Sequence, residues 1–210
     1  MILSNVEIHR ALDQGRLVIV PEPQPRIPGD GVDCPYQASA VDLSLADEIS
    51  WLKEDLPLNI DLRRGGFAKL FGPNSERRKI TEEQPFVLKP HKLVLGRTHE
   101  RVALPIRADV ECLAARIEGR SSYARCGLLV HFTAPTIHAG FDGTITLELC
   151  NLGPASITLY PRAPICQLIV ETVSGIPFRN DSQFQGQKDA GGVRRRQLRK
   201  ASAFSPRKRA

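Results

Sequence analysis

The residues with the clearest chemistry lie in the middle of the chain and begin with the short stretch Gly119–Ser122. This stretch is a predicted tight turn that contains one arginine and two hydroxyls, Arg120, Ser121 and Ser122, and a second arginine, Arg125, follows three residues later. Turn N–H groups, hydroxyl donors and the bidentate arginine fork all bind phosphate oxygens. The group therefore predicts a site for a phosphorylated ligand.

A carboxylate follows in the stretch Thr144–Cys150, which alternates strictly between apolar and polar residues. One face of the predicted strand is apolar and consists of Ile145, Leu147 and Leu149, while Glu148 falls on the other face. A carboxylate held by a rigid strand can take up and release protons. Beside a phosphate-binding group, Glu148 predicts acid–base chemistry on a nucleotide.

Each of these residues, taken alone, has a simpler interpretation. Gly119–Ser122 could be an ordinary β-turn, Glu148 a solvated strand residue, and His131 a buried histidine with satisfied nitrogens. The spacing from the turn through Arg125 and His131 to Glu148 favours a single functional site.

The elements that must position these residues are mainly short strands. Ser4 and Glu7 form a capping box that starts a predicted helix at Asn5, and Gly15 follows its predicted end at Gln14. Predicted strands recur after that at roughly regular spacing: Leu17–Val20, Ala40–Leu45, Phe86–Leu88, Leu93–Leu95, Val102–Ile106, Val110–Ile117, Leu128–Thr133, Ile145–Cys150, Ile157–Tyr160 and Ile165–Val170. This pattern is typical of a barrel or jelly-roll sandwich.

Residues 47–84 give a weaker signal, and no chemistry is assigned to them. Exposed turns are expected at three places: Arg63–Gly66, Gly72–Asn74 and Arg77–Lys79. The last is a basic cluster that we expect to be a solvated loop, the alternative being contact with the tail of a ligand.

The net charge of +6 comes from one end of the chain. Residues 193–210 contain eight Lys or Arg and no acid, which leaves 21 basic against 23 acidic residues in the rest. The body, with a net charge of −2, is not expected to bind nucleic acid, so only the basic tail could do so. We expect this tail to be disordered.

Composition and cysteine usage predict a cytoplasmic protein without a membrane span. The five cysteines are an odd number and contain no Cys-x-x-Cys pair, which is typical of reduced thiols. No stretch of 18 apolar residues and no signal-peptide pattern occurs.

The central motifs resemble those of the trimeric dCTP deaminases, which belong to the dUTPase superfamily. The similar segments are Glu118–Leu128, Val130–Ala134, Ile137–Gly143 and Thr146–Leu149, with weaker likeness at Met1–Ser4, Ala40–Leu43, Gln167–Ile169 and Gln185–Gln187. The resemblance implies a mainly β protein, a distorted jelly-roll or β-barrel of the dUTPase-like type with a short N-terminal helix. Its domain would span residues 1–175, a C-terminal arm 176–192 would close over the site, and 193–210 would form the tail.

The resemblance also implies the activity, the hydrolytic deamination of dCTP to dUTP and ammonia in pyrimidine deoxynucleotide metabolism. Glu148 would be the general acid and base, with Ser121 and Arg125 holding the water and the tetrahedral centre. Arg120 and Ser122, together with Ser121, would bind phosphates, and His131 would be a supporting group. The pyrimidine would be read by the backbones of Thr133, Ala134, Thr146 and Leu147. The sugar and phosphates would also be contacted by His138, Gln183 and Gln187. The active sites would lie between the subunits of a homotrimer.

No protein-bound metal or cofactor is expected. Zinc deaminases carry His-x-Glu and Pro-Cys-x-x-Cys, and this chain has neither. Only Mg²⁺ is expected, and it would arrive with the nucleotide triphosphate.

Two positions depart from the family pattern. His138 stands where the family has an Asp for the sugar 3′-hydroxyl, and Gln183 replaces a phosphate-binding Lys. The first change argues against dUTPase or bifunctional deaminase–diphosphatase activity. Two alternatives stay open: a catalytically altered, deaminase-like nucleotide-binding protein, and a relative acting on another pyrimidine nucleotide.

Overall fold

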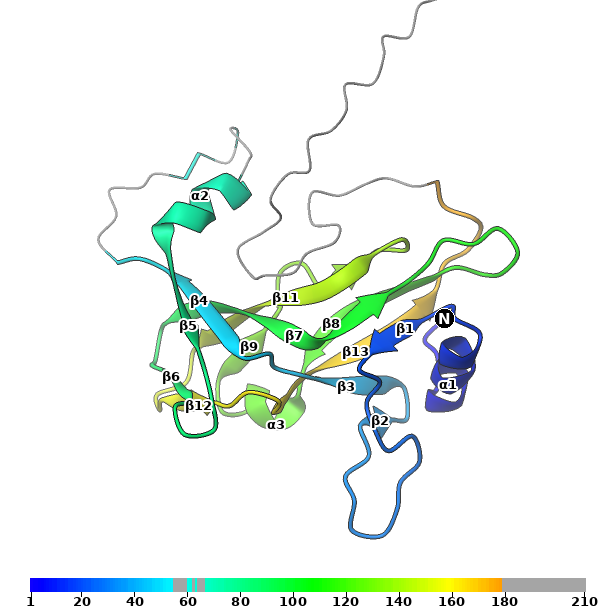
Figure 1. Ribbon diagram of the computed structural model, residues 1–210, viewed down its shortest axis with the longest axis horizontal. Coiled ribbons are helices and arrows are strands. Elements are labelled where there is room, and N and C mark those ends of the chain that lie inside the picture. Colours follow the sequence, from blue (N-terminus) through cyan, green and yellow to red (C-terminus); the bar gives the residue numbers. More distant parts are fainter. Residues whose placement is uncertain (55–59, 62, 64–66, 179–210) are drawn as a thin grey trace, which may run out of the picture.

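The computed structural model describes residues 1–54, 60–61, 63 and 67–178 (Figure 1). The described residues form two larger antiparallel sheets and one small strand pair. The first sheet has the order β10-β8-β13-β3-β2, with bounds Thr136–Ile137, Leu113–Gly119, Pro164–Thr172, Ala40–Ser44 and Tyr36–Gln37. The predicted mainly β fold is confirmed.

The second sheet contains the strand that carries Glu148. Its order is β5-β4-β7-β11-β9, with bounds Ser75–Lys79, Glu48–Leu52, Leu93–Ala103, Asp142–Asn151 and Leu128–Val130; β1, Val18–Val20, also pairs with β7. The small pair consists of β6, Phe86–Leu88, and β12, Ile157–Leu159. Glu148 therefore lies on a strand that is paired on both sides.

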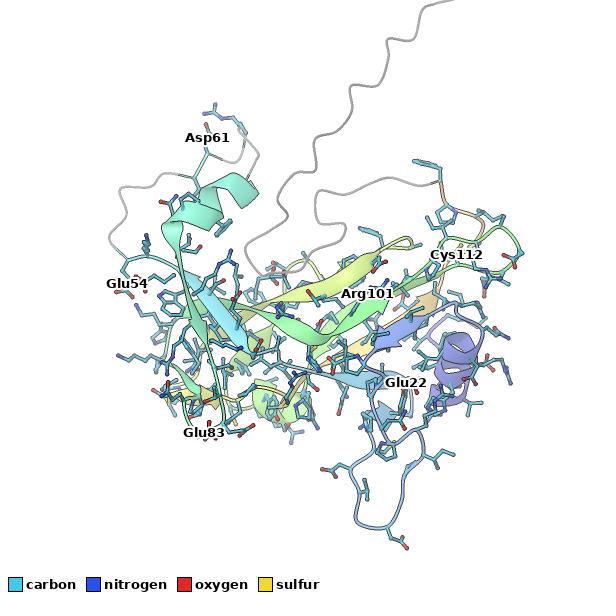
Figure 2. The ribbon with its side chains drawn as sticks, viewed as in Figure 1. Glu22, Glu54, Asp61, Glu83, Arg101 and Cys112 are labelled. Carbon is cyan, nitrogen blue, oxygen red and sulfur yellow. The ribbon has the colours of Figure 1, made fainter. Side chains whose placement is uncertain are left out.

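The core lies between the two larger sheets, and one cluster of buried apolar side chains includes residues of both. Along β11 burial alternates, so that Ile145, Leu147 and Leu149 are buried while the residues between them are partly exposed. At its start, β11 is joined to β7 by an ion pair of 2.6 Å between Asp142 and Arg101, which Figure 2 labels on β7. The predicted apolar face of this strand is confirmed.

The N-terminal helix follows its sequence signals closely. Helix α1 spans Asn5–Asp13, the Ser4 side chain accepts a hydrogen bond from the Glu7 N–H, and Gln14 is the C-cap. Gly15 follows with a φ of 64°, the left-handed conformation that glycine adopts without strain. Buried Ile8 and Ala11 attach the helix to the body.

Three predictions between residues 47 and 106 are wrong. Arg77–Lys79 belongs to strand β5 rather than to a loop, because it pairs with Glu48–Ser50 of β4, a strand that sequence reasoning also missed. Gly72–Asn74 is the end of helix α2, Phe67–Asn74, and not a turn. Leu93–Leu95 and Val102–Ile106 were expected to be separate strands, yet β7 runs continuously from Leu93 to Ala103 because β11 pairs with it along this length.

Several predictions concern residues outside the described ranges. These are most of the Arg63–Gly66 turn, all but residues 176–178 of the arm, and the whole basic tail. None of the described helices is long and apolar enough to cross a membrane.

Candidate functional site

Glu148 extends from the middle of β11, opposite Leu95 of β7. Its neighbours Leu147 and Leu149 have no exposed surface, so the strand is fixed by the core on the face opposite the carboxylate. The Glu148 side chain itself is 31% exposed. Glu148 therefore projects from a rigid strand, as predicted from the sequence.

The side chain of His131 lies against this carboxylate. The strand expected to run from Leu128 to Thr133 ends at Val130, because His131 has a φ of 51°, outside the range of a strand. Its N–H donates to the Glu148 carbonyl at 2.9 Å, and its Nδ1 lies 2.7 Å from Glu148 Oε2. The backbone of His131 thus places its ring against the candidate base.

The two side chains are 2.7 Å apart but do not have the geometry of an aligned hydrogen bond. Among the described residues, Glu148 Oε2 and both ring nitrogens of His131 are buried without a hydrogen-bond partner of good geometry. His131 is only 7% exposed, so water does not replace those partners freely. A polar group left in this state is costly unless a ligand or a neighbouring chain satisfies it.

The pKa of Glu148 reflects two opposing causes. Burial disfavours the carboxylate and by itself raises the pKa, whereas the proximity of His131 favours the carboxylate. The histidine outweighs burial, so the pKa of Glu148 lies below its usual value. The alternating sequence pattern did not reveal the His131 contact that sets this direction.

The residues predicted to bind phosphate lie on and beside a short helix, and not in a tight turn. Helix α3 spans Ser121–Ala124, with Arg120 as its N-cap and Arg125 as its C-cap. The chain coils here because the Tyr123 and Ala124 N–H groups both donate to the Arg120 carbonyl at 3.0 Å. Ser121, Ser122 and Arg125 are exposed, as binding of a phosphorylated ligand requires.

Arg120 differs from the other members of the group because it already has protein partners. Its Nη2 lies 3.6 Å from Asp42 Oδ2, and its guanidinium lies 5.4 Å from the centre of the Tyr123 ring. Asp42 is only 8% exposed, and its Oδ1 accepts a hydrogen bond of 2.9 Å from Gln167. Sequence reasoning assigned no role to Asp42 or Gln167, although each is a polar residue with apolar neighbours on both sides in its strand.

The remaining predicted residues follow His131, precede Glu148, lie in the loop after β10 or fall outside the described ranges. Thr133 and Ala134 are exposed and follow His131, while Thr146 and Leu147 precede Glu148 on β11. His138 is exposed in the loop after β10. Gln183 and Gln187 are not among the described residues.

Two contacts therefore organise the region within one chain, one between Glu148 and His131 and one between Arg120 and Asp42. Across the described part of the chain, no hydrogen bond or ion pair links Ser121 or Arg125 to Glu148. Ser121 and Arg125 are joined to each other, since the Arg125 N–H donates to the Ser121 carbonyl at 3.2 Å, and Glu148 is held separately on β11.

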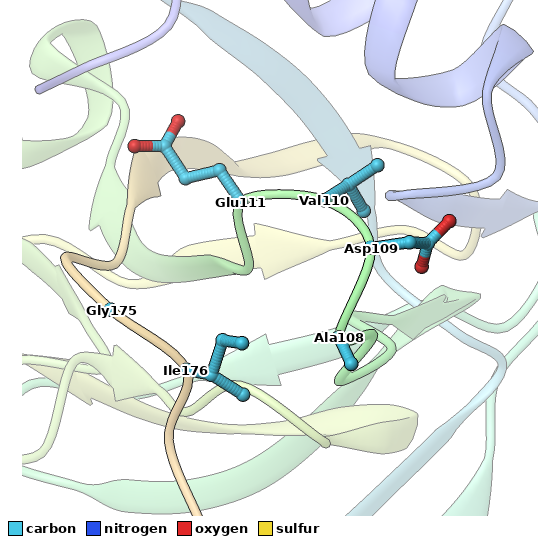
Figure 3. A pocket seen from close by; sticks show the side chains of 6 residues that line it. All are labelled: Ala108, Asp109, Val110, Glu111, Gly175 and Ile176. Carbon is cyan, nitrogen blue, oxygen red and sulfur yellow. The ribbon is translucent and has the colours of Figure 1, made fainter.

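A separate hollow of about 260 Å³ lies away from these residues. Its lining comes from Ala108–Glu111, before β8, and from Gly175 and Ile176, after β13 (Figure 3). These are the ends of β8 and β13 remote from Gly119, which leads into α3, so the hollow is not part of the candidate site. In the described ranges, no three His, Cys, Asp or Glu side chains gather as metal ligands.

Comparison with known proteins gives consistent results across nearly the whole chain. A family model described as dCTP deaminase-like matches residues 2–173. A dUMP-forming dCTP deaminase of Methanosphaera stadtmanae is 34% identical over 192 residues, 89% of each chain. A dCTP deaminase of Haloarcula marismortui is 38% identical over 192 residues, 89% of this chain and 91% of that one.

A solved structure of 2′-deoxycytidine 5′-triphosphate deaminase from Agrobacterium tumefaciens is similar, with a TM-score of 0.55 and 17% identity. The match covers 80% of this chain but only 47% of that one, so this chain corresponds to about half of the larger protein. At this level of identity the likeness concerns the fold, and it agrees with the predicted β architecture.

Proposed function

Because the chain belongs to the dCTP deaminase-like family, we propose that it catalyses the hydrolytic deamination of dCTP to dUTP and ammonia, in pyrimidine deoxynucleotide metabolism. The observation that supports this most strongly is the Glu148 carboxylate, fixed by the core strand β11 and held ionised by His131. An ionised carboxylate at a partly exposed position is the form that a general base needs.

In this mechanism Glu148 takes a proton from water as the water attacks C4 of cytosine. The same carboxyl gives this proton to N3, then takes the proton of the new C4 hydroxyl and gives it to the amine, and ammonia leaves as the C4 carbonyl forms. General acid–base catalysis of this kind contributes typically about 10²–10⁴-fold to a rate. Substrate bound over the site would exclude water from Glu148 and raise its proton affinity, which suits its second role as an acid.

Helix α3 supplies the polar groups that face the reacting centre and the phosphates. We assign Ser121 and Arg125 to the attacking water and the tetrahedral centre, and Arg120, Ser121 and Ser122 to the phosphates. Support comes from the exposure of Ser121, Ser122 and Arg125 on one short helix. The backbones of Thr133, Ala134, Thr146 and Leu147 would read the pyrimidine edge.

The substrate would be the magnesium complex of dCTP, with no metal held by the protein itself. The absence of the zinc-deaminase motifs from the sequence supports this assignment.

We place the active site between the subunits of a homotrimer, with Glu148 from one subunit and α3 from the next. In the part of the chain that the structure describes, no hydrogen bond or ion pair joins Glu148 to Ser121 or Arg125, which supports this division. We assign the protein to the cytoplasm, in line with five cysteines that are all free.

The choice between dUTP and dUMP as product rests on one residue of this chain. The matched relatives include both dUMP-forming enzymes and enzymes named simply dCTP deaminase. Removal of diphosphate needs a second water activated by a carboxylate. The resemblance implies that an Asp activates this water in the dUTPase branch of the superfamily, and in this chain His138 stands at the corresponding position. We therefore assign dUTP as the product.

The test is to incubate the purified protein with each pyrimidine deoxynucleotide and Mg²⁺, after zinc chelation, and to separate the products by chromatography. The expected result is conversion of dCTP to dUTP with one ammonia per turnover. Formation of dUMP and diphosphate would refute the product assignment alone. Binding of dCTP without ammonia release would refute the enzyme assignment and favour a deaminase-like binding protein.

A further inference from the structure

Helix α3 carries the exposed residues Ser121 and Arg125, yet it has little packing of its own. It is four residues long, and none of them is buried. A helix of this length is not stable by itself, and only one of its side chains, the partly buried Tyr123, packs against the core. The orientation of the helix therefore depends largely on the chain segments at its two ends.

The N-terminal end is attached to the first sheet. Gly119, the last residue of β8, pairs with Cys166 of β13, and Cys166 is completely buried. This ladder fixes the chain up to the residue before Arg120. The C-terminal end needs a second attachment if the helix is to keep one orientation.

That second attachment is a backbone contact between Gly127 and Gly153. The Gly127 carbonyl accepts a hydrogen bond of 2.8 Å from the Leu152 N–H, and Gly127 has a φ of 91°. A Cβ on Gly127 would lie 2.3 Å from the Gly153 nitrogen, and a Cβ on Gly153 would lie 2.2 Å from the Cys126 carbonyl oxygen. Only glycine at both positions allows the two backbones to approach so closely.

Asn151 holds the Gly153 side of this contact. Its side chain is completely buried and uses all of its bonding groups: Nδ2 donates to the carbonyls of Leu88 at 3.0 Å and Ala155 at 2.8 Å, and Oδ1 accepts from the Gly153 N–H at 2.9 Å. Asn151 is also the last residue of β11, where it pairs with Leu128. One side chain thus joins the end of β11 to the turn that touches Gly127.

We propose that Asn151 is a positioning residue, which fixes the C-terminal end of α3 through the Gly127–Gly153 backbone contact and thereby orients Ser121 and Arg125. An amide is required because the site needs two donors and one acceptor in a compact group, which a carboxylate or an aliphatic chain of similar size does not offer. Asn151 stands three residues after Glu148 on the same strand. The strand that carries the base therefore also sets the place of the helix.

The expected loss of turnover rests on the proposed deaminase function, whereas the expected change in amide hydrogen exchange does not. Asn151→Asp keeps the acceptor and the shape but removes both donors and places charge beside two carbonyls. We expect amide hydrogen exchange in residues 121–128 to become roughly tenfold faster or more. Exchange in β13 should stay unchanged, since β13 does not depend on this contact.

The experiment compares Asn151→Asp with the control Asn5→Asp, in which a helix N-terminal residue receives the same chemical change. Gly127→Ala tests the contact from its other side, and Gly29→Ala is its control, since a Cβ at Gly29 meets nothing within 4 Å. Hydrogen exchange by mass spectrometry and the kcat and KM for dCTP are measured on each folded variant. The Gly127→Ala variant carries the test if Asn151→Asp does not fold.

The expected pattern is faster exchange in residues 121–128 for both test variants, with a kcat reduced at least as much as KM is raised. Neither control should show either change. Unchanged exchange in residues 121–128 would overturn the proposal, as would a lowered kcat without any exchange change. A wild-type protein that does not deaminate dCTP would refute the proposed function, while the exchange result would still decide the role of Asn151.

Discussion

Strand β11 and helix α3 hold their functional residues in opposite ways. β11 pairs with β7 on one side and with β9 on the other, and every second side chain enters the core. α3 has no fully buried residue, and apart from the partly buried Tyr123 it is held by the strands and backbone contacts at its ends. The proposed base Glu148 is therefore fixed by hydrophobic packing, whereas Ser121 and Arg125 depend mainly on backbone geometry.

This difference predicts which substitutions affect chemistry and which affect stability. On β11 the catalytic residue and the core residues alternate, so neighbouring positions should respond differently to mutation. On α3 the exposed side chains can change without loss of stability, and their effect should be on catalysis alone.

The largest effect is expected from Glu148→Gln, which keeps the size of the side chain but cannot accept the proton from water. We expect the turnover of dCTP to fall about 10²–10⁴-fold, with the fold and nucleotide binding retained. The matched control is Glu118→Gln, because Glu118 is an exposed strand glutamate paired with Arg116. Steady-state ammonia release measures both, and near-normal turnover in Glu148→Gln would remove it as the base.

The next largest effect contrasts the stability contributions of the two regions. Leu147 has no exposed surface, so Leu147→Ala should lower the free energy of unfolding by about 2–5 kcal/mol. Ser122→Ala on α3 should change it by less than about 0.5 kcal/mol, because Ser122 is exposed. Urea titrations of both variants test this, and equal losses would show that α3 is packed more firmly than its burial indicates.

A smaller effect is expected at His138, where an imidazole stands in place of a carboxylate. A neutral histidine offers one acceptor and no negative charge to a 3′-hydroxyl. His138→Asp should therefore increase the preference for dCTP over its 3′-deoxy analogue by roughly tenfold. Affinities of both ligands for both proteins give the ratio, and an unchanged ratio would mean that residue 138 does not contact the sugar.

The smallest effect at neutral pH is expected from His131→Asn. Glu148 must be ionised to act as base, so activity is present above its pKa and is lost as the pH falls through it. Without the histidine, burial remains as the main cause and raises the pKa of Glu148, so the acid limb of kcat/KM should move to higher pH. Asparagine tolerates the positive φ of this position, and an unmoved limb would show that His131 does not set the pKa of Glu148.

The sequence was sufficient for the elements whose signals are local. Alternation along Thr144–Cys150 and the capping residues Ser4 and Glu7 led to correct predictions of β11 and α1, because each pattern reflects the burial or bonding of its own segment. The exposed strand β5 has no such pattern, since pairing with β4 stabilises it and not the burial of one face. Its prediction as a loop failed for that reason.

The same distinction between local sequence signals and long-range contacts applies to the candidate site. The residue types and their order predicted Glu148 and the α3 group, but not the contacts that tune them. The low pKa of Glu148 depends on His131 turning out of its strand, and the pairing of Arg120 depends on Asp42 and Gln167 from two other strands. Contacts between residues far apart in sequence cannot be read from periodicity.

The measurement that tests the central claim most directly is subunit complementation. The claim is that dCTP deamination needs Glu148 on the core strand of one subunit and Arg125 on the helix of another. Glu148→Gln and Arg125→Ala are each expected to release almost no ammonia from dCTP, but in trimers assembled from equal amounts of both, about a quarter of the sites should combine two intact contributions. Recovery of about that fraction of wild-type ammonia release is the predicted result, and mixed trimers as inactive as the two parents would contradict the account.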